Sequence, residues 1–439
     1  MKFLGVGEYC DLGAMYLRLM QAGHDVKVYV EHADYHDIYA GMLNFTSDWQ
    51  NELDWIAQAG QDGIIIFESA TKGKLQDDLR LKGFQVIGGS EFGDKLEADR
   101  EFGQQIMQEM DMCVAKTFQF NDYATAIQFI ADNKARYVYK NNGADSARTR
   151  NYIGMLDDGS DLQVLLDLYK QQNQQNQHSG KPHTADFVLM QYISGIEIGV
   201  GAYFNGENFL QPACLDWEHK RFFSGNLGEL TGEMGTVVTY DGAEIIFKRT
   251  LVHLADKLKA SGYCGYINLN MIANEKGLWP LEFTSRFGYP GYSICSALHQ
   301  HAWDSIFRQI FDKSSLILAT HAGFATGVVL TVPPFPYTYG YAALSKGTPI
   351  LFAPSITDDE MQHLHFSEVK KDKDYLVTSG VIGCIGTSIG RGDTVSAACL
   401  SAYQLAAKVI VPNIRYRKDI GANLMANELQ QLKSWGYIK

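Results

Sequence analysis

The sequence lacks long hydrophobic runs. No stretch of ~18 consecutive apolar residues occurs, so we expect no membrane-spanning helix. The opening segment, MKFLGVGEYCDLG, reads directly into a strand and a turn without an apolar signal region. We therefore expect a cytoplasmic protein.

Cysteine pairs and excess positive charge are also lacking. The seven cysteines are scattered and form no CxxC pair, which favours reduced thiols over a disulfide framework or a zinc site. The formal net charge of −12 argues against a nucleic-acid partner, because binding a phosphate backbone requires a positive surface. A local basic pocket for a small phosphorylated ligand stays compatible with this charge.

The length and the pattern of the chain predict several domains. At 439 residues the chain is too long for one core, and its 46% apolar and 20% charged residues are ordinary for a globular protein. Residues 1–95 alternate strands with helices, which predicts a parallel sheet covered on both faces. The turn Gly5-Val6-Gly7, with Gly13 further on, only weakly resembles a dinucleotide-binding fingerprint and is more often a tight turn.

A predicted hairpin brings together two side chains of opposite charge. Its β-rich runs, Tyr263–Asn274 and Leu281–Gly291, are separated by a short polar turn. The second run contains Glu282 and Arg286, a combination suited to holding a metal-bound polyphosphate. The alternative is an ordinary edge hairpin with a solvated ion pair.

Other polar segments have two interpretations each. Lys140 ends a predicted strand, and the following glycine-rich loop contains Arg148; such a loop suits phosphates but could equally be solvent-exposed. The charged, glycine-rich segment 218–233 is either a mobile loop over a site or a solvated face.

Two further segments have one predicted structure each. Residues 96–112 predict one amphipathic helix, and the polar tract 171–183 predicts a surface loop.

Six short motifs, in order, resemble those of the phosphoribosylamine–glycine ligase (glycinamide ribonucleotide synthetase) family of the ATP-grasp superfamily. The match covers nearly the whole chain and is weakest in the first ~80 residues. The motifs are GGSEFGDKLEADREF, VYKNNG, WEHKR, LTGEMG, LEFTSRFGYPG and YRKDIG.

The resemblance implies an α/β fold of the ATP-grasp type. It implies an N-terminal parallel-sheet (pre-ATP-grasp) substrate domain at 1–95, a two-lobed ATP-grasp domain at 96–314 with a mobile lobe at about 113–190, and a small C-terminal α/β domain at 315–439. MgATP would lie between two β-sheets. The implied partners are small molecules, and the chain would be a monomer or a homodimer without a nucleic acid or membrane partner.

The resemblance also implies a reaction and a set of site residues. A carboxylate would attack the γ-phosphate of ATP to give an acyl phosphate, and an amine would then displace phosphate. Phosphoribosylamine and glycine would give glycinamide ribonucleotide for purine biosynthesis, with Mg²⁺ or Mn²⁺ as the metal. The implied residues are Arg100, Lys140, Arg148, Met190, Tyr192 and Glu197 for ATP; Glu282, Asn270 and Thr284 for the metal; and His219, Lys220 and Arg286 for the acid substrate and the acyl phosphate.

The chain departs from the family at three places. Thr284 replaces a metal-binding asparagine, Tyr289-Pro290-Gly291 replaces Asp-Pro-Glu, and Tyr9–Gly13 replaces a Gly-Gly-Arg-Glu-His segment that helps to bind the phosphorylated amine. A related ligase with a different amine or acid is therefore an alternative. A nucleotide-binding protein without catalysis is another, and a dinucleotide oxidoreductase using Glu31 is the remaining one.

Overall fold

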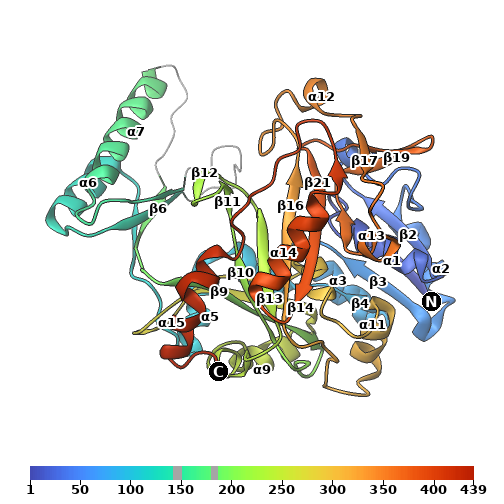
Figure 1. The fold of residues 1–439 in the computed structure, drawn as a ribbon. Coiled ribbons are helices and arrows are strands. Elements are labelled where there is room, and N and C mark those ends of the chain that lie inside the picture. Colours follow the sequence, from blue (N-terminus) through green and yellow to red (C-terminus); the bar gives the residue numbers. More distant parts are fainter. Residues whose placement is uncertain (142–150, 179–185) are drawn as a thin grey trace. The chain divides into compact units, whose positions relative to one another are not determined.

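The computed structural model describes residues 1–141, 151–178 and 186–439, with the side chains of 175–178 excepted. The chain forms two compact units (Figure 1). The first comprises Met1–Asp111, Ile196–Glu275 and Pro280–Lys439, and the second comprises Met112–Gly195 and Lys276–Trp279. The division into three domains drawn from the sequence stays a prediction. Within the described ranges, every helix is too short or too polar to cross a membrane.

The first unit begins with the predicted parallel sheet. Its strands β1 (Lys2–Gly7), β2 (Asp25–Val30), β3 (Gly63–Phe67) and β4 (Gln85–Ile87) lie in the order β2-β1-β3-β4 and are all parallel. Strand β3 is buried along its whole length, as expected for a parallel strand covered on both faces. The connecting helices are α1 (Gly13–Gln21), α2 (Leu53–Ala57) and α3 (Gly73–Leu81).

The glycines of β1 have a packing role. A Cβ on Gly5 would meet the Tyr16 ring at 2.4 Å, and a Cβ on Gly7 would meet the Glu68 carboxyl at 2.2 Å. Glu68 directly follows β3, is only 3% exposed and accepts a hydrogen bond from the Asp11 amide at 2.8 Å. The close approach of these two side chains therefore explains why β1 carries glycine.

The predicted hairpin forms one edge of a larger sheet. Strands β14 (Cys264–Asn274) and β15 (Gly277–Thr284) are neighbours in the order β15-β14-β9-β10-β13-β16-β21-β18. The pairings from β14 through β21 to β18 are antiparallel. The other strands are β9 (Ile196–Asn205), β10 (Cys214–Glu218), β13 (Gly235–Thr239), β16 (Phe324–Thr331), β18 (Leu364–Phe366) and β21 (Cys384–Gly392).

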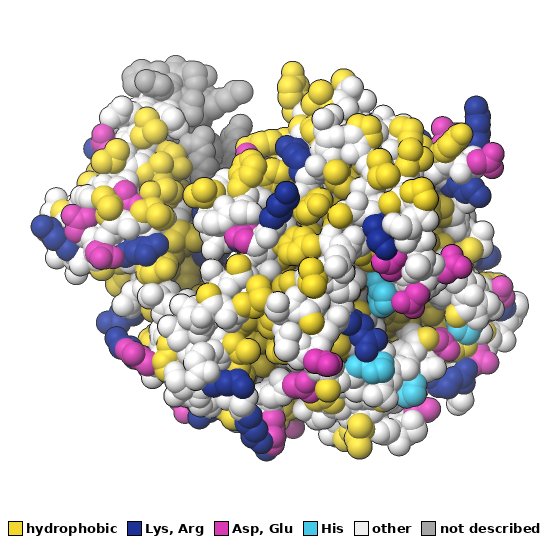
Figure 2. Space-filling view, in the orientation of Figure 1, with side chains coloured by type: hydrophobic (Ala, Val, Ile, Leu, Met, Phe, Trp, Pro, Cys, Tyr) yellow, Lys and Arg dark blue, Asp and Glu magenta, His cyan; other side chains and the backbone are white. Residues whose placement is uncertain are grey.

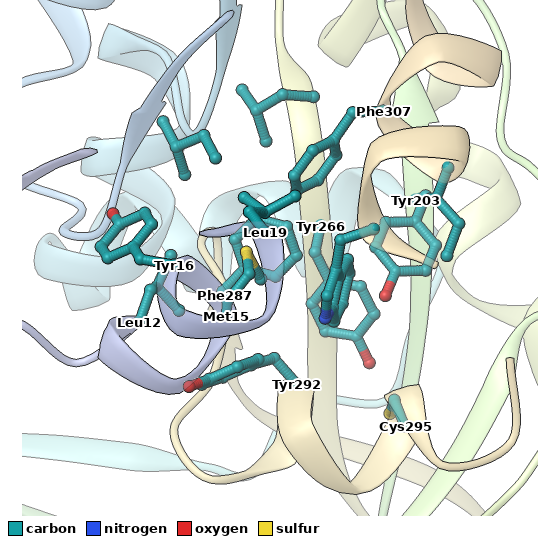
Figure 3. Packing of buried hydrophobic residues seen from close by; sticks show 14 of the residues in the cluster. Leu12, Met15, Tyr16, Leu19, Tyr203, Tyr266, Phe287, Tyr292, Cys295 and Phe307 are labelled. Carbon is teal, nitrogen blue, oxygen red and sulfur yellow. The ribbon is translucent and has the colours of Figure 1, made fainter. Parts of the chain in front are cut away.

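A shared apolar core joins the parallel sheet and the central sheet of the first unit. It contains Met15 and Leu19 of α1 together with Phe287 and the α11 residue Phe307, and Figure 3 shows these side chains turned toward one another. The ring centroids of Phe287 and Phe307 are 6.3 Å apart. Helices α10 (Gly291–Ser296) and α11 (Trp303–Asp312) thus pack between the parallel sheet and the central sheet.

The second unit is a small sheet packed on two helices. Strands β5 (Thr117–Phe120), β6 (Tyr137–Asn141), β7 (Tyr152–Ile153) and β8 (Phe187–Gln191) pair antiparallel in the order β5-β8-β6-β7. Helices α6 (Tyr123–Asp132) and α7 (Ser160–His178) bury Ile130, Leu162 and Leu166 against it.

Two sequence predictions about helices are wrong in part. The expected single helix at 96–112 lies in two helices, α4 (Glu91–Ala98) and α5 (Arg100–Glu109), because Asp99 is extended and its carboxylate caps the Phe102 amide at 3.1 Å. Residues 171–178 continue α7 instead of forming a loop. Glutamine is a good helix former, so low hydrophobicity alone did not exclude a helix there.

The C-terminal part adds a second antiparallel sheet and a helix on the central sheet. Strands β19 (Val369–Asp372), β20 (Tyr375–Thr378), β17 (Pro349–Phe352) and β22 (Val409–Ile410) pair in that order. Helix α14 (Val395–Ala406) begins after the capping residue Thr394, whose hydroxyl accepts from the Ala397 amide at 3.2 Å. The remaining elements are β11 (Arg221–Phe223), β12 (Leu227–Leu230), α8 (Glu244–Arg249), α9 (Ala255–Ala260), α12 (Tyr341–Leu344), α13 (Asp358–Met361) and α15 (Leu429–Ser434).

The charges of the surface are mixed. Figure 2 shows lysine and arginine side chains interspersed with acidic ones over the visible face. Some surface charges pair directly, and Lys248 contacts Glu244 at 2.6 Å on one face of α8.

The buried Glu68 makes stability depend on pH. Burial, followed by the charge of Asp11, raises the pKa of Glu68 to about 8. Between the ordinary glutamate value and about 8 the folded state binds a proton that the unfolded state has released, so the free energy of unfolding falls as pH rises. Glu68→Gln does not titrate, and its stability relative to the parent should rise by about 1–3 kcal/mol between pH 5 and pH 8, measured by urea unfolding.

A control variant, Glu52→Gln, should show the opposite dependence of stability on pH. The hydrogen bond from Lys27 to Glu52, at 2.5 Å, lowers the pKa of Glu52, so that carboxylate stabilises the fold above its unfolded pKa and loses this effect as pH falls. The stability of Glu52→Gln relative to the parent should therefore not rise with pH. If the free energy of unfolding of Glu68→Gln relative to the parent stays constant from pH 5 to pH 8, the raised pKa of Glu68 is wrong.

Candidate active site

Strand alternation places a row of polar side chains on one face of the central sheet. Along β10, Asp216 and Glu218 point to this face, and Leu215 and Trp217 point to the other. Cross-strand pairing aligns Glu218 with Thr236 of β13 and Asp216 with Gly199 of β9. The polar residues of four adjacent strands thus converge on one surface.

Lys220 lies at the centre of this surface. Its ammonium is 3.2 Å from Glu218, 3.3 Å from Glu197 and 3.3 Å from Glu282. Burial disfavours the charged form, but the carboxylates of Glu218, Glu197 and Glu282 outweigh it and raise the pKa of Lys220 above its usual value. The lysine is therefore a fixed positive charge held among three acids.

A pocket of about 210 Å³ opens at this surface. Five of the residues predicted from the sequence line it: Lys220, Asn270, Glu282, Thr284 and Arg286. The structure adds Asp216, Thr236 and Asn268, and it brings Glu218 and Glu233 of the segment 218–233 to the same pocket.

Arg286 is positioned by helix α4. Its Nε donates to the Glu97 carboxylate at 3.1 Å, and the adjacent Ser285 amide donates to the same carboxylate at 2.8 Å. The Ser285 hydroxyl also donates to the carbonyl of Gly93 at 2.6 Å. Glu97 therefore fixes the strand end that presents Arg286 to the pocket.

The segment that departs from the family lies next to this arginine. The Arg286 charge acts on the Asp11 carboxyl, and the Tyr292 hydroxyl donates to the Asp11 carbonyl at 3.3 Å. Tyr9 stacks on His32 with centroids 4.9 Å apart. The segment Tyr9–Gly13 therefore places an acidic and an aromatic side chain near Arg286, although neither Asp11 nor Tyr9 belongs to the pocket lining.

The donors on the pocket wall fit a hard divalent cation. Glu282 is exposed at 57% of its side chain, and the Asn270 amide, 3.1 Å from Glu218, lies on the neighbouring strand. Carboxylate, amide and hydroxyl oxygens are the ligands that Mg²⁺ prefers. Among the described residues no three acidic, histidine or cysteine side chains already converge on one metal position, and the three carboxylates instead surround the Lys220 ammonium.

The closed end of the pocket contains a buried acid. Asp216 is 6% exposed, its Oδ2 accepts from the Asn268 amide at 2.6 Å, and its Oδ1 has no hydrogen-bond partner among the described residues. Burial, followed by the charge of Glu218, raises the pKa of Asp216 to about 8.

His219 does not line this pocket. Strand alternation turns it away from Glu218 and Lys220, and its Nε2 accepts from the Gly421 amide at 3.1 Å. Burial, followed by the charge of Arg417, lowers the pKa of His219 to about 4. The substrate role drawn from the motif match stays a prediction, and the geometry gives His219 a contact with the YRKDIG segment.

That segment ties the β11–β12 hairpin to the C-terminal part of the chain. Arg417 is 2% exposed, pairs with Asp419 at 2.6 Å, and donates to the Arg221 carbonyl at 3.0 Å and to the Asn226 side chain at 2.8 Å. The Asp419 carboxylate accepts from the Gly225 amide at 2.8 Å. Two of the six motifs, WEHKR and YRKDIG, thus meet in one hydrogen-bonded cluster.

The other residues that were predicted to bind ATP lie in both units, apart from one outside the described residues. Lys140 on β6 pairs with Val188 of β8 in the second unit. Met190 is buried in the same unit, and Tyr192 lies under the Arg136 guanidinium at 3.6 Å. Arg100 begins α5 in the first unit, where the Glu282 charge acts on it. Arg148 lies outside the described residues.

The residues that sequence reasoning missed did leave a signal. Asp216 lies two residues before Glu218 and four before the predicted Lys220, and Asn268 lies two residues before the predicted Asn270 on β14. Charged or amide side chains on every second residue of an otherwise apolar strand indicate a polar face over a site.

Comparisons with known proteins agree with this arrangement. The profile described as "Phosphoribosylglycinamide synthetase, ATP-grasp (A) domain" matches residues 98–292. The chain is 27% identical over 372 residues to a phosphoribosylamine–glycine ligase of Helicobacter pylori, covering 80% of both chains. It is 24% identical to the Neisseria meningitidis serogroup B enzyme of the same name, covering 79% of this chain and 80% of the relative. The resemblance predicted from the motifs is confirmed.

Solved structures confirm the fold. The crystal structure of a phosphoribosylamine–glycine ligase from Thermotoga maritima has a TM-score of 0.70 at 19% identity and covers 96% of this chain and 100% of that chain. A Campylobacter jejuni biotin carboxylase crystallised as an ATP complex has a TM-score of 0.62 at 12% identity, covering 98% and 96%. The fold is therefore the predicted ATP-grasp α/β architecture with an N-terminal parallel sheet.

Removing the central ammonium should destabilise the fold in a pH-dependent way. Lys220→Met leaves three carboxylates facing one another, which raises their pKa values and makes the folded state bind protons as pH falls. The loss of stability relative to the parent should be about 1–2 kcal/mol at pH 7.5 and should shrink toward pH 4.5, measured by thermal unfolding. Lys248→Met, which removes an exposed ion pair, should shift stability by less than about 0.5 kcal/mol. An equal loss at both pH values would contradict the electrostatic account.

Proposed function

We propose that the protein is an ATP-dependent carboxylate–amine ligase. The basis is that residues 98–292 match the ATP-grasp domain of phosphoribosylglycinamide synthetase. Its relatives of known name are phosphoribosylamine–glycine ligases. The reaction closest to theirs joins phosphoribosylamine and glycine with ATP to give glycinamide ribonucleotide, ADP and phosphate. The observation that carries the proposal is the meeting of Lys220, Glu282 and Arg286 on one pocket.

The proposed reaction has two steps. A carboxylate oxygen of the acid attacks the γ-phosphorus of ATP, the bond to the β-phosphate oxygen breaks, and ADP leaves. The amine nitrogen then attacks the carbonyl carbon of the acyl phosphate, loses a proton, and phosphate leaves as the amide forms. Positioning and charge neutralisation supply most of the catalysis in such phosphoryl transfers.

The site residues have separate tasks in this proposal. The fixed charges of Lys220 and Arg286 hold the acid and neutralise the charge of its phosphorylated form. Glu282, with Asn270 and Thr284, would hold a divalent metal, which we take to be Mg²⁺ and which neutralises ATP phosphates when it is bound. The ATP contacts of Arg100, Lys140, Arg148, Met190, Tyr192 and Glu197, the cytoplasmic location and a monomeric or homodimeric state stay predictions.

The proposal predicts ATP consumption that requires an acid. Purified protein with MgATP and glycine should release ADP and phosphate when phosphoribosylamine is supplied, and with hydroxylamine in place of the amine it should form a hydroxamate. Complementation of a bacterium deficient in glycinamide ribonucleotide synthesis tests the same substrates in the cell. Binding of ATP without turnover for any acid–amine pair would favour a protein without catalysis.

The hairpin carboxylate should be essential for turnover. Glu282→Gln removes an anionic oxygen donor from the pocket, so hydroxamate formation should fall by at least about 100-fold while the far-ultraviolet circular dichroism spectrum is unchanged. Glu275→Gln, an exposed carboxylate in the turn of the same hairpin, should keep its rate within about twofold. A Glu282→Gln protein with the parent rate would show that the metal assignment is wrong.

A further inference from the structure

Two of the seven cysteines lie against each other at the wall of the pocket. The Sγ atoms of Cys214 and Cys295 are 3.6 Å apart, although the two residues are separated by 81 positions in the chain. Cys214 begins β10, and Cys295 lies on α10 together with the pocket residue Tyr292 (Figure 3). Both thiols are free, and the residues are only 0% and 3% exposed. A pair of thiols therefore connects the strand that carries the central charges with a helix of the pocket wall.

The two thiols differ in their access to the pocket. Cys295 lines the pocket, whereas Cys214 lies behind it with its Sγ 3.4 Å from the Leu215 carbonyl oxygen. The hydrogen bond with Cys295, followed by burial, raises the pKa of Cys214, so this thiol keeps its proton at neutral pH. A small oxidant that enters the pocket therefore meets Cys295 first.

The start of α10 leaves room for a small movement. A Cβ on Gly288 or Gly291 would meet nothing within 4 Å among the described residues, and both glycines line the pocket. The two sulfur atoms of a disulfide are about 2 Å apart, so the thiols have to approach each other by roughly 1.5 Å. Helix α10 has only six residues and borders open space at its start, which makes this shift feasible.

We propose that Cys214 and Cys295 form a reversible disulfide when the protein meets a peroxide, and that this bond disables the active site. The loss of activity rests on the proposed function. The formation of the bond does not depend on it.

The reaction balances in two steps. The Cys295 sulfur attacks one oxygen of hydrogen peroxide, the O–O bond breaks, and water leaves while Cys295 becomes a sulfenic acid. The Cys214 sulfur then attacks the Cys295 sulfur, the S–O bond breaks, and the thiol proton of Cys214 leaves with the hydroxyl group as a second water. The two thiols lose two electrons, and the peroxide gains them. A dithiol reductant restores both thiols by exchange.

The bond would act on the whole site because of where its ends lie. Lys220, Asn270, Glu282 and Arg286 all belong to the chain segment between the two cysteines and all line the pocket. Catalysis that depends on positioning is sensitive to displacements of about 1 Å, which can lower a rate by about 100-fold. A protonated, buried Cys214 reacts slowly, so this pair should respond to sustained exposure to peroxide.

The unmodified protein provides the first test. It is exposed to excess hydrogen peroxide, its remaining thiols are blocked with N-ethylmaleimide, and it is digested without reductant for peptide mapping by mass spectrometry. We expect the peptides of Cys214 and Cys295 to be joined and lighter by two hydrogen atoms. Hydroxamate formation from glycine, MgATP and hydroxylamine should fall by about 10- to 100-fold and return after treatment with dithiothreitol.

Two variants separate this bond from other oxidation. Cys214→Ala should form no link and keep most of its rate under the same exposure, and dimedone should label its Cys295 as the sulfenic acid. The control Cys264→Ala removes another buried cysteine at the first residue of a strand, β14, and should be linked, inhibited and restored like the parent.

The outcomes distinguish this inference from the proposed function. If mapping finds no link between Cys214 and Cys295 in the oxidised parent, the inference is wrong. If the link forms and the rate stays unchanged, or if Cys214→Ala is inhibited and restored as the parent is, the bond does not control activity. If no acid supports ADP release by the reduced parent, the proposed function fails and the control of activity fails with it, while mapping still decides the bond. The measurements on the parent hold even if a variant does not fold.

Discussion

The alternation of side chains along β-strands is the constraint on which the site depends. Along β10 and β14 the polar residues Asp216, Glu218, Asn268 and Asn270 turn to one face of the sheet. Strands β9 and β13 add Glu197 and Thr236 to the same face. One residue of register shift in β10 would exchange Glu218 with the buried Trp217. The same hydrophobic burial that holds the strand in place therefore also determines which charges meet in the pocket.

Electrostatics then organise that face around one lysine. Three carboxylates would repel one another if no cation lay between them, and Lys220 provides that charge from within the chain. The cluster is close to Arg286, whose guanidinium is in turn held by Glu97 of α4. Each cation of the pocket is thus positioned by an acid from another element, which fixes the charges before any ligand binds.

Residues that match the family motifs and residues that depart from them line the same pocket, where Thr284 and Tyr289 lie beside Glu282 and Arg286. Glu282, Lys220 and Arg286 lie in motifs that resemble those of the family, and Asp11, in the segment Tyr9–Gly13, interacts with Arg286 from outside the pocket lining.

The sequence by itself predicted the fold class, the N-terminal parallel sheet, the β14–β15 hairpin and five residues of the pocket, because these follow from local periodicity and from short motifs. It did not predict the break at Asp99 or the helix at 171–178, since capping and propensity competed there with hydrophobic pattern. Only the tertiary structure decided that Glu218 and Asp216 join the site, that His219 faces Gly421, and that Gly199 leaves space for a buried acid. Each of these depends on strand pairing or a hydrogen bond between segments separated in the chain, which local sequence does not encode.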